Sequence, residues 1–120
     1  MDILNSYQKD GDIVLAVAEV GELKKHASNH VQSLAHDISG NTEHIRKVLN
    51  YFESIAVCID AKIYDDKIIK TTMYSTVVTI WDTCLPYVEE RRKLKNKPTF
   101  YQELELLVDR WKKDPLKSKK

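Results

Sequence analysis

The residues of this chain best suited to binding chemistry follow a proline–tyrosine pair in its second half. Tyr87, Arg91 and Arg92 are spaced so that they would lie on adjacent turns of one helix. The planar guanidinium of arginine can donate two parallel hydrogen bonds to a carboxylate or a phosphate. The alternative is a ladder of surface ion pairs with Glu89 and Glu90. The sequence leaves both interpretations of this stretch open.

Three lysines extend the same basic stretch beyond the arginines. The candidate partner-binding residues are therefore Tyr87, Arg91, Arg92, Lys93, Lys95 and Lys97. With the lysine-rich tail from Lys112 to Lys120, this run could bind nucleic acid. The formal net charge is only +1, however, and no aromatic residues are interleaved within the basic runs. We therefore favour a protein partner over nucleic acid.

A metal site is the second kind of chemistry that the spacing suggests. Glu22, His26 and His30 recur every four residues and would share one face of a helix. A zinc site needs a third or fourth ligand, and none is evident elsewhere in the sequence. We interpret the three as solvated or interface polar residues, and expect neither a metal nor a cofactor.

The remaining polar and aromatic candidates have structural explanations. Asp65 and Asp66 precede a predicted helix, where a carboxylate accepts hydrogen bonds from free backbone amides. Trp81 and Trp111 lie at helical spacing among aliphatic residues and are expected in the core. The sequence has no glycine-rich phosphate loop, cysteine–histidine pairing or nucleophile elbow. We therefore do not expect an enzyme.

The elements that position these residues are predicted to be helices. A helix that starts at Asn41 or Thr42 and runs to about Lys62 carries an apolar stripe with a spacing of three and four. This stripe consists of Ile45, Val48, Leu49, Phe52, Ile55, Ala56, Ile59 and Ile63. Further helices are expected at 67–94 and 100–112, the last capped by Thr99. The predicted fold is all-α, a compact bundle of three to five helices at 42–113 followed by a basic tail at 114–120.

One segment has a propensity that disagrees with its pattern. Residues 71–80 are rich in β-branched side chains, which favour strands. The three-four spacing of apolar residues persists through them, and no turn residues bracket them, so we predict helix. Pro86 lacks an amide hydrogen and should kink or restart that helix.

The first 41 residues are predicted to hold one long helix, from Asp12 to Ile38, ended by a turn at 39–41. Ile13, Val20, Ala27 and Leu34 recur every seven residues, as in a seam shared by two helices. A rod of this length would extend past the bundle, so we predict a homodimer through it. In the alternative, the segment folds back on the bundle and the chain is a monomer.

The composition suits a charged-surface helical protein, with 120 residues, 42% hydrophobic and 31% charged. The first half carries nine acidic and five basic residues, and the second nine acidic and fourteen basic. No signal peptide or twenty-residue apolar run is present. Cys58 and Cys84 lie in apolar stretches and are interpreted as free thiols of a cytoplasmic protein, with a disulfide as the alternative.

Several motifs between Arg46 and Trp111 resemble those of a known family. They are Leu49-Asn50-Tyr51-Phe52-Glu53 with Ile55-Ala56, then Asp65-Asp66, Trp81, Pro86-Tyr87 with Arg91 and Arg92, and finally Tyr101, Glu105 and Trp111. This set resembles small all-helical bacterial domains catalogued as a domain of unknown function. The resemblance implies a helical fold and no reaction. Many members are similar to membrane-tethered proteins with one spanning helix ahead of the domain, from which this chain departs, because residues 1–44 hold no span.

The function expected from these observations is non-catalytic protein–protein interaction by a small bacterial or phage protein. One alternative is a mobile-element-encoded inhibitor of a host defence complex, which rests on size alone. The other is a weak nucleic-acid binder that uses the basic second half.

Overall fold

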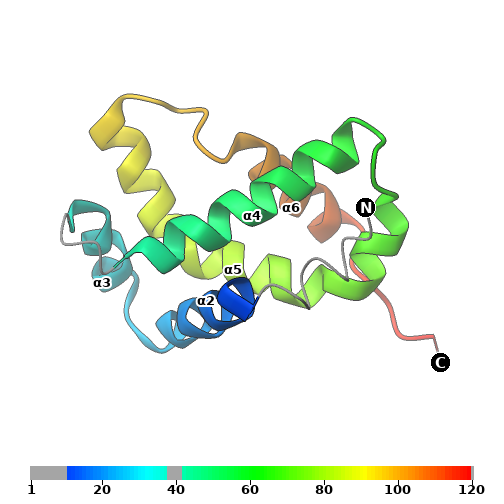
Figure 1. Cartoon of the computed structure of the whole chain (residues 1–120), viewed down its shortest axis with the longest axis horizontal. Helices are drawn as coiled ribbons and strands as arrows, with labels where there is room; N and C mark the ends of the chain where they lie inside the picture. The colour runs from blue at the N-terminus through cyan, green and yellow to red at the C-terminus, as the bar shows by residue number, and fades with distance from the viewer. Residues whose placement is uncertain (1–10, 38–41, 120) are drawn as a thin grey trace.

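The computed structural model describes residues 11–37 and 42–119, and every regular element among them is a helix (Figure 1). The elements are α2 (Gly11–Glu22), the 3-10 helix η1 (Leu23–Lys25), α3 (Ser28–Ser33), the 3-10 helix η2 (Leu34–His36), α4 (Glu43–Asp60), α5 (Asp66–Lys95) and α6 (Gln102–Lys113). The prediction of an all-α bundle is confirmed.

The α4 helix buries the apolar stripe that its sequence predicts. Seven of the eight stripe residues lie in the core: Ile45, Val48, Leu49, Phe52, Ile55, Ala56 and Ile59. The eighth, Ile63, is 69% exposed, so its assignment to the stripe was wrong. The helix ends at Asp60, and Lys62 has a positive φ of 65°, which turns the chain away before Ile63 is reached.

The β-branched segment predicted as helix is part of α5. Asp65 caps its start, because its Oδ1 accepts a hydrogen bond from the amide of Ile68 at 3.1 Å. Within the segment, the hydroxyl of Thr71 donates to the carbonyl of Lys67 at 2.8 Å, and Thr72 makes similar bonds one position later. These bonds satisfy the threonine hydroxyls inside the helix, which reduces their preference for other backbone conformations.

Pro86 lies inside α5 without ending it. Figure 1 shows α5 changing direction toward its carboxy-terminal end, where the last turns rise away from the preceding ones. A proline removes one amide donor and its ring opposes the carbonyl four residues earlier, and both effects bend a helix. The predicted kink is therefore observed, and it directs Tyr87 and the residues after it across the start of α4.

The start of α6 differs from the prediction. Thr99 does not cap it; the residue before the helix is Tyr101, which has a left-handed backbone with φ 58° and no capping hydrogen bond from its side chain. Instead, Oε1 of Glu53 in α4 accepts the amide hydrogen of Leu104 at 2.7 Å. A cap supplied by a distant helix replaces the local cap that was expected.

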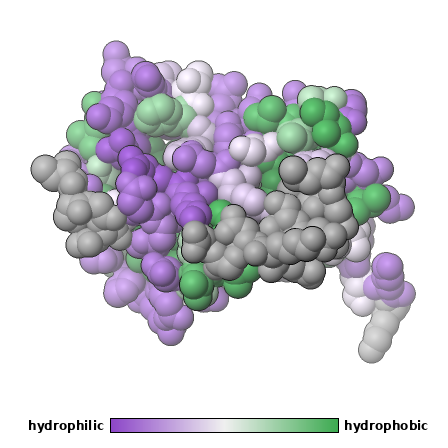
Figure 2. All heavy atoms as spheres, viewed as in Figure 1, coloured by the Kyte–Doolittle hydropathy of each residue, from purple (hydrophilic) through white to green (hydrophobic). Residues whose placement is uncertain are grey.

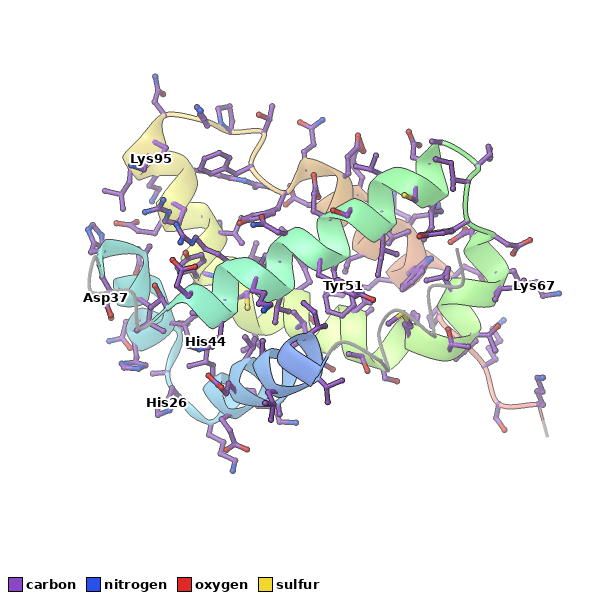
Figure 3. All side chains as sticks on the ribbon, in the orientation of Figure 1. His26, Asp37, His44, Tyr51, Lys67 and Lys95 are labelled. Carbon is purple, nitrogen blue, oxygen red and sulfur yellow. The ribbon has the colours of Figure 1, made fainter. Side chains whose placement is uncertain are left out.

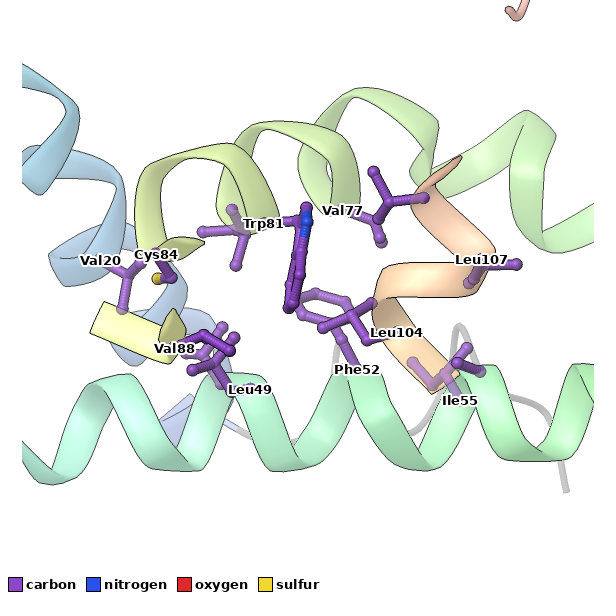
Figure 4. Packing of buried hydrophobic residues seen from close by; sticks show 14 of the residues in the cluster. Val20, Leu49, Phe52, Ile55, Val77, Trp81, Cys84, Val88, Leu104 and Leu107 are labelled. Atoms are coloured by element: carbon purple, nitrogen blue, oxygen red, sulfur yellow. The ribbon is translucent and has the colours of Figure 1, made fainter. Parts of the chain in front are cut away.

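One core joins all the described helices. Figure 4 shows Trp81 reaching from α5 toward Phe52 of α4 and Leu104 of α6, and the exposed fraction of each is 2% or less. Trp111 is also buried, and its indole Nε1 donates to Oδ1 of Asp66 at 2.8 Å. The predicted core positions of Phe52, Ile55, Trp81 and Trp111 are confirmed.

The single long helix predicted from Asp12 to Ile38 is wrong. His26 (φ −103°, ψ 157°) and Ala27 (φ −68°, ψ 152°) are extended, and they separate α2 with η1 from α3 with η2. The break lets α2 pack against α4 and α5 while α3 packs against α5. Val20 and Val31, on either side of it, are both buried in the common core. Tertiary packing of two short helices thus replaces one rod.

The break also changes the basis of the predicted homodimer. Two of the seam residues, Ile13 and Val20, are buried within the protomer, and Ala27 lies exposed at the break. The described segment folds back on the bundle, as the alternative interpretation expected. The homodimer stays a prediction, without the exposed seam from which it was argued. The turn predicted at 39–41 lies outside the described residues.

The two cysteines are free, with Cys84 buried and Cys58 partly exposed. Among the residues that the structure describes, no helix combines the length and the apolar character needed to cross a membrane.

Candidate functional site

The predicted partner-binding residues divide into three groups in the structure. Arg92 is used inside the protein: its Nε and one NH group donate to the carbonyl of Phe100, at 3.0 and 2.8 Å. The same NH group forms an ion pair with Glu105 at 3.0 Å. Arg92 therefore holds the loop between α5 and α6 in place and is not available to a partner.

Tyr87 and Arg91 line a pocket between three elements, which we call the tyrosine pocket. It has a volume of about 260 Å³ and lies between α4, the bent end of α5 and the loop before α6. Its lining residues are Arg46, Asn50, Tyr87, Arg91, Phe100 and Tyr101. The pocket thus brings two guanidinium groups, two phenols and one amide to one place.

A smaller pocket of about 170 Å³, the side pocket, adjoins it. Arg46, Tyr87 and Arg91 line both pockets. Asp37 and Glu43 are among the other residues that line the side pocket. Arg46 forms an ion pair with Glu43 one helical turn earlier. Two acidic residues thus line the side pocket, and none lines the tyrosine pocket.

Arg91 has no such acidic partner in the described part of the chain. Its NH1 donates to the carbonyl of Ala35 at 3.3 Å, and no carboxylate lies within ion-pair distance of it among residues 11–37 and 42–119. The predicted ladder with Glu89 and Glu90 is not observed. Glu90 instead accepts from Gln32 at 3.1 Å and contacts His36 Nε2 at 2.7 Å. Arg91 therefore keeps a positive charge at the tyrosine pocket that no ion pair neutralises.

The two tyrosines place phenol groups in a partly desolvated environment. Burial raises the pKa of Tyr87 above its ordinary value, and the charges of Arg91 and Arg46 oppose that rise. Burial also raises the pKa of Tyr101, to about 12. Both phenols are therefore protonated at neutral pH and can donate a hydrogen bond. Within the described part of the chain, neither makes a hydrogen bond to a protein group.

Lys93, Lys95 and Lys97 form the third group and are exposed. None of them forms an ion pair with another described residue. The ammonium of Lys97 lies 5.6 Å from the centre of the Phe100 ring, which also lines the tyrosine pocket. Figure 3 shows Lys95 at the far end of α5, on the side of the molecule where Asp37 also lies. Lys97 thus lies next to the tyrosine pocket, and Lys93 and Lys95 are exposed on the last turns of α5.

Four residues of the pocket were absent from the predicted set: Arg46, Asn50, Phe100 and Tyr101. Arg46 and Asn50 lie one turn apart on α4, and Tyr101 precedes α6. The spacing of Arg46, Asn50 and Glu53 puts them on one polar row beside the apolar stripe of α4, and this row was a usable signal. Nothing local indicated that Tyr87, on the next helix, would face that row.

The other candidate sites have simpler roles. The rings of His26 and His30 lie 4.7 Å apart, although the helix between them is broken. Glu22 forms an ion pair with Lys25 at 2.8 Å and does not approach the two rings as a third ligand. Within the described ranges, no three histidine, cysteine or acidic side chains are grouped to hold a metal ion. Asp66, next to the cap Asp65, binds Trp111.

The molecule has two larger hollows, the first of which shares Arg46 and Asn50 with the tyrosine pocket. One, of about 550 Å³, lies between α2 and α4, and the other, of about 770 Å³, lies at the corner between α4 and α5. Figure 2 shows hydrophobic atoms on the surface near that corner, where Ile63 and Ile68 are exposed. Charged side chains dominate the lining of both hollows, and several are already paired, such as Asp66 with Arg110. The tyrosine pocket differs in that three aromatic rings line it beside the two guanidinium groups.

Comparison with known proteins gives a family and no activity. The model of a family described as "Domain of unknown function (DUF4760)" matches residues 1–111. The match includes the first 45 residues, which the motifs from Arg46 to Trp111 did not reach. No curated protein and no solved structure matches the chain significantly.

Proposed function

Because the chain belongs to this family of domains of unknown function, we propose a function from its geometry: it is a non-catalytic module that binds an acidic partner protein. One observation carries the proposal. Lys93, Lys95 and Lys97 are exposed at and just after the end of α5, and Lys97 lies beside Phe100 of a pocket that contains two arginines, one of them without an ion-pair partner in the described residues.

The charges of this surface suit the capture of an acidic protein. Lys93, Lys95 and Lys97 extend into solvent, where they attract a negatively charged surface over roughly one Debye length, about 8–10 Å at physiological salt. Arg91 and the phenol of Tyr87 lie deeper, where a bound group is shielded from water and hydrogen bonds are stronger. The lysines would first attract the acidic partner from a distance, and the pocket would then bind one of its groups.

The free thiols support a cytoplasmic location for this activity. Burial raises the pKa of the Cys84 thiol to about 12, so it stays protonated and unreactive at neutral pH. Cys58 is also free. Reduced cysteines are the norm in the cytoplasm, and we place the protein there as part of the proposal.

Affinity capture with matched variants tests the function. The full chain is immobilised, exposed to a nuclease-treated bacterial lysate, and the bound proteins are identified by mass spectrometry. The test variant replaces Lys93, Lys95 and Lys97 with glutamine. The control variant replaces Lys24, Lys67 and Lys113 with glutamine. These three exposed lysines lie outside the site, so the control has the same change in net charge as the test variant.

An acidic protein that the wild type and the control variant capture, and that the test variant loses, supports the proposal. Equal capture by both variants contradicts it, because the binding would then not depend on the site. The nucleic-acid alternative is tested by titrating duplex and single-stranded DNA at several salt concentrations. Tight DNA binding that weakens steeply with salt and is lost in the test variant would replace our proposal with that alternative.

A further inference from the structure

The tyrosine pocket contains a hydrogen-bond donor that no described protein group accepts. Tyr87 is 2% exposed as a residue, yet it lines the pocket, and no hydrogen bond of its hydroxyl is found within the described residues. The hydroxyl is not among the side-chain atoms that are both enclosed and unpaired, so a ligand can reach it from the pocket. An acceptor atom from a ligand would satisfy this hydroxyl, and Arg91 beside it favours an acceptor with negative charge.

The charges around the pocket distinguish between classes of anion. Arg46 is paired with Glu43, which leaves Arg91 as the one pocket guanidinium without a carboxylate partner among residues 11–37 and 42–119. One unpaired positive charge matches a carboxylate, which carries a single negative charge. A phosphate monoester carries a charge of about −1.5 to −2 at neutral pH, and would leave excess negative charge beside Glu43.

The walls of the pocket suit an apolar stem. The rings of Phe100, Tyr101 and Tyr87 line it together with Asn50. A carboxylate at the end of a short aliphatic or aromatic chain could place its stem against these rings and its oxygens toward Arg91 and Tyr87. Burial of the stem adds affinity, and the charge-assisted hydrogen bonds fix its orientation.

We infer that the tyrosine pocket binds one carboxylate group of the partner, a side chain or a chain end, through Arg91 and the Tyr87 hydroxyl. This inference rests on the proposed function, since it names the group of the acidic partner that enters the pocket. It makes Tyr87 a binding residue, although its burial gives it the character of a core residue.

Small molecules that carry only the proposed group provide the test. The full chain, isotopically labelled, is titrated at constant ionic strength with benzoate, with benzamide as its neutral counterpart, and with phenyl phosphate. Benzoate should cause saturable shifts in the NMR signals of the Arg91 guanidinium and of the Tyr87 and Tyr101 rings. Benzamide should cause none of comparable size. If phenyl phosphate binds more tightly than benzoate, or benzoate does not saturate, the carboxylate assignment is wrong.

Three variants identify the groups responsible. Tyr87→Phe removes the hydroxyl and keeps the ring, so its melting temperature should stay close to that of the wild type. Its benzoate affinity should fall about three- to tenfold, as expected for the loss of one hydrogen bond. Arg91→Gln should weaken benzoate binding by at least as much, whereas Lys67→Gln, at the opposite end of the same helix and outside the site, should leave it nearly unchanged. Unaltered affinity in the folded Tyr87→Phe variant overturns the inference.

The two proposals can fail separately. Loss of the captured partner in the lysine variant, with no benzoate binding to the wild type, would leave the proposed function standing and remove the carboxylate pocket. If benzoate binding depends on Tyr87 but the lysine variant still captures the same proteins, the carboxylate pocket stands. The proposal that the lysines bind an acidic partner is then wrong.

Discussion

Glu53 in α4 caps α6 at Leu104, which lies 51 residues later in the chain. Its carboxylate oxygen Oε1 accepts the backbone amide hydrogen of Leu104 at 2.7 Å. The first amides of a helix have no partners within it, and here a side chain from another helix satisfies one of them. Burial raises the pKa of Glu53, and hydrogen bonds from the amides of Leu104 and Glu103 oppose that rise. The contact therefore joins two helices at some cost in desolvation.

Replacing Glu53 should separate the cap from its charge. Glu53→Ala leaves the Leu104 amide without this acceptor and should lower the free energy of unfolding by about 1–2 kcal/mol. Glu53→Gln keeps an acceptor oxygen without the cost of burying a charge, and should be clearly more stable than the alanine variant. Urea unfolding followed by circular dichroism measures both. Equal stability of the two variants would show that the hydrogen bond contributes nothing.

The raised pKa of Glu53 predicts how its contribution to stability depends on pH. A carboxyl whose pKa is higher in the folded state binds its proton more readily there, so its contribution to stability is full below about pH 4.5, the ordinary value. That contribution is lost as pH rises through the raised pKa. The stability of the wild type minus that of Glu53→Gln should therefore fall with rising pH and then level off. A difference that grows with pH contradicts the assignment.

Glu90 should behave in the opposite way. Hydrogen bonds from His36 and then Gln32 lower its pKa, so its contribution to stability is present above about pH 4.5 and is lost as pH falls through the lowered value. Thermal unfolding of the wild type and Glu90→Gln between neutral and acidic pH measures it. The two melting temperatures should converge on acidification, and a gap of constant size would exclude this role for Glu90.

Arg92 should be a structural residue despite its place in the basic stretch. Arg92→Ala removes the bonds to Phe100 and Glu105 and should lower the free energy of unfolding by about 1.5–3 kcal/mol, as for hydrogen bonds to a charged group. Lys93→Ala, the exposed neighbour, serves as the matched control and should change stability by less than about 0.5 kcal/mol. If Arg92→Ala is as stable as Lys93→Ala, the loop is held by other contacts.

Trp81→Ala should be the most destabilising of these changes. Removal of a large buried aromatic side chain typically costs about 3–5 kcal/mol. Leu106→Ala, on an exposed part of α6, controls for the loss of an apolar side chain and should have a small effect. Scanning calorimetry compares the two melting temperatures. An unchanged melting temperature for Trp81→Ala, with binding abolished, would make Trp81 part of a site instead of the core.

The helices and most of the core could be predicted because burial along one helix is a local pattern. The stripe through Ile45, Phe52 and Ile59 identifies the inner face of α4 without knowledge of its neighbours. The same rule failed at Ile63, because the helix ended first, and at His26, where the spacing continued through a break. In the second case both halves satisfy the three-four rule, and only the packing of α2 and α3 on the bundle decides between a rod and two short helices.

The candidate site was predicted in part for the same reason. The guanidinium of Arg91 and the phenol of Tyr87 were identified because they lie one turn apart on one helix. Their partner Arg46 lies on another helix, and Arg92 was assigned to the site because sequence does not show that it binds Phe100 instead. The pocket depends on the bend in α5 and on the loop before α6, which are long-range features.

The break at His26–Ala27 also divides the hydrogen bonds of the first segment into two independent sets. The amide of His26 donates backward to Leu23, and the carbonyl of Ala27 accepts forward from His30. Residues added between them would disturb neither set, and lengthening a flexible connection costs only about 0.6 kcal/mol for each doubling. His26, Ala27 and Ser28 are exposed. This position is therefore the natural insertion point for a reporter or an epitope tag that must leave both the core and the tyrosine pocket intact.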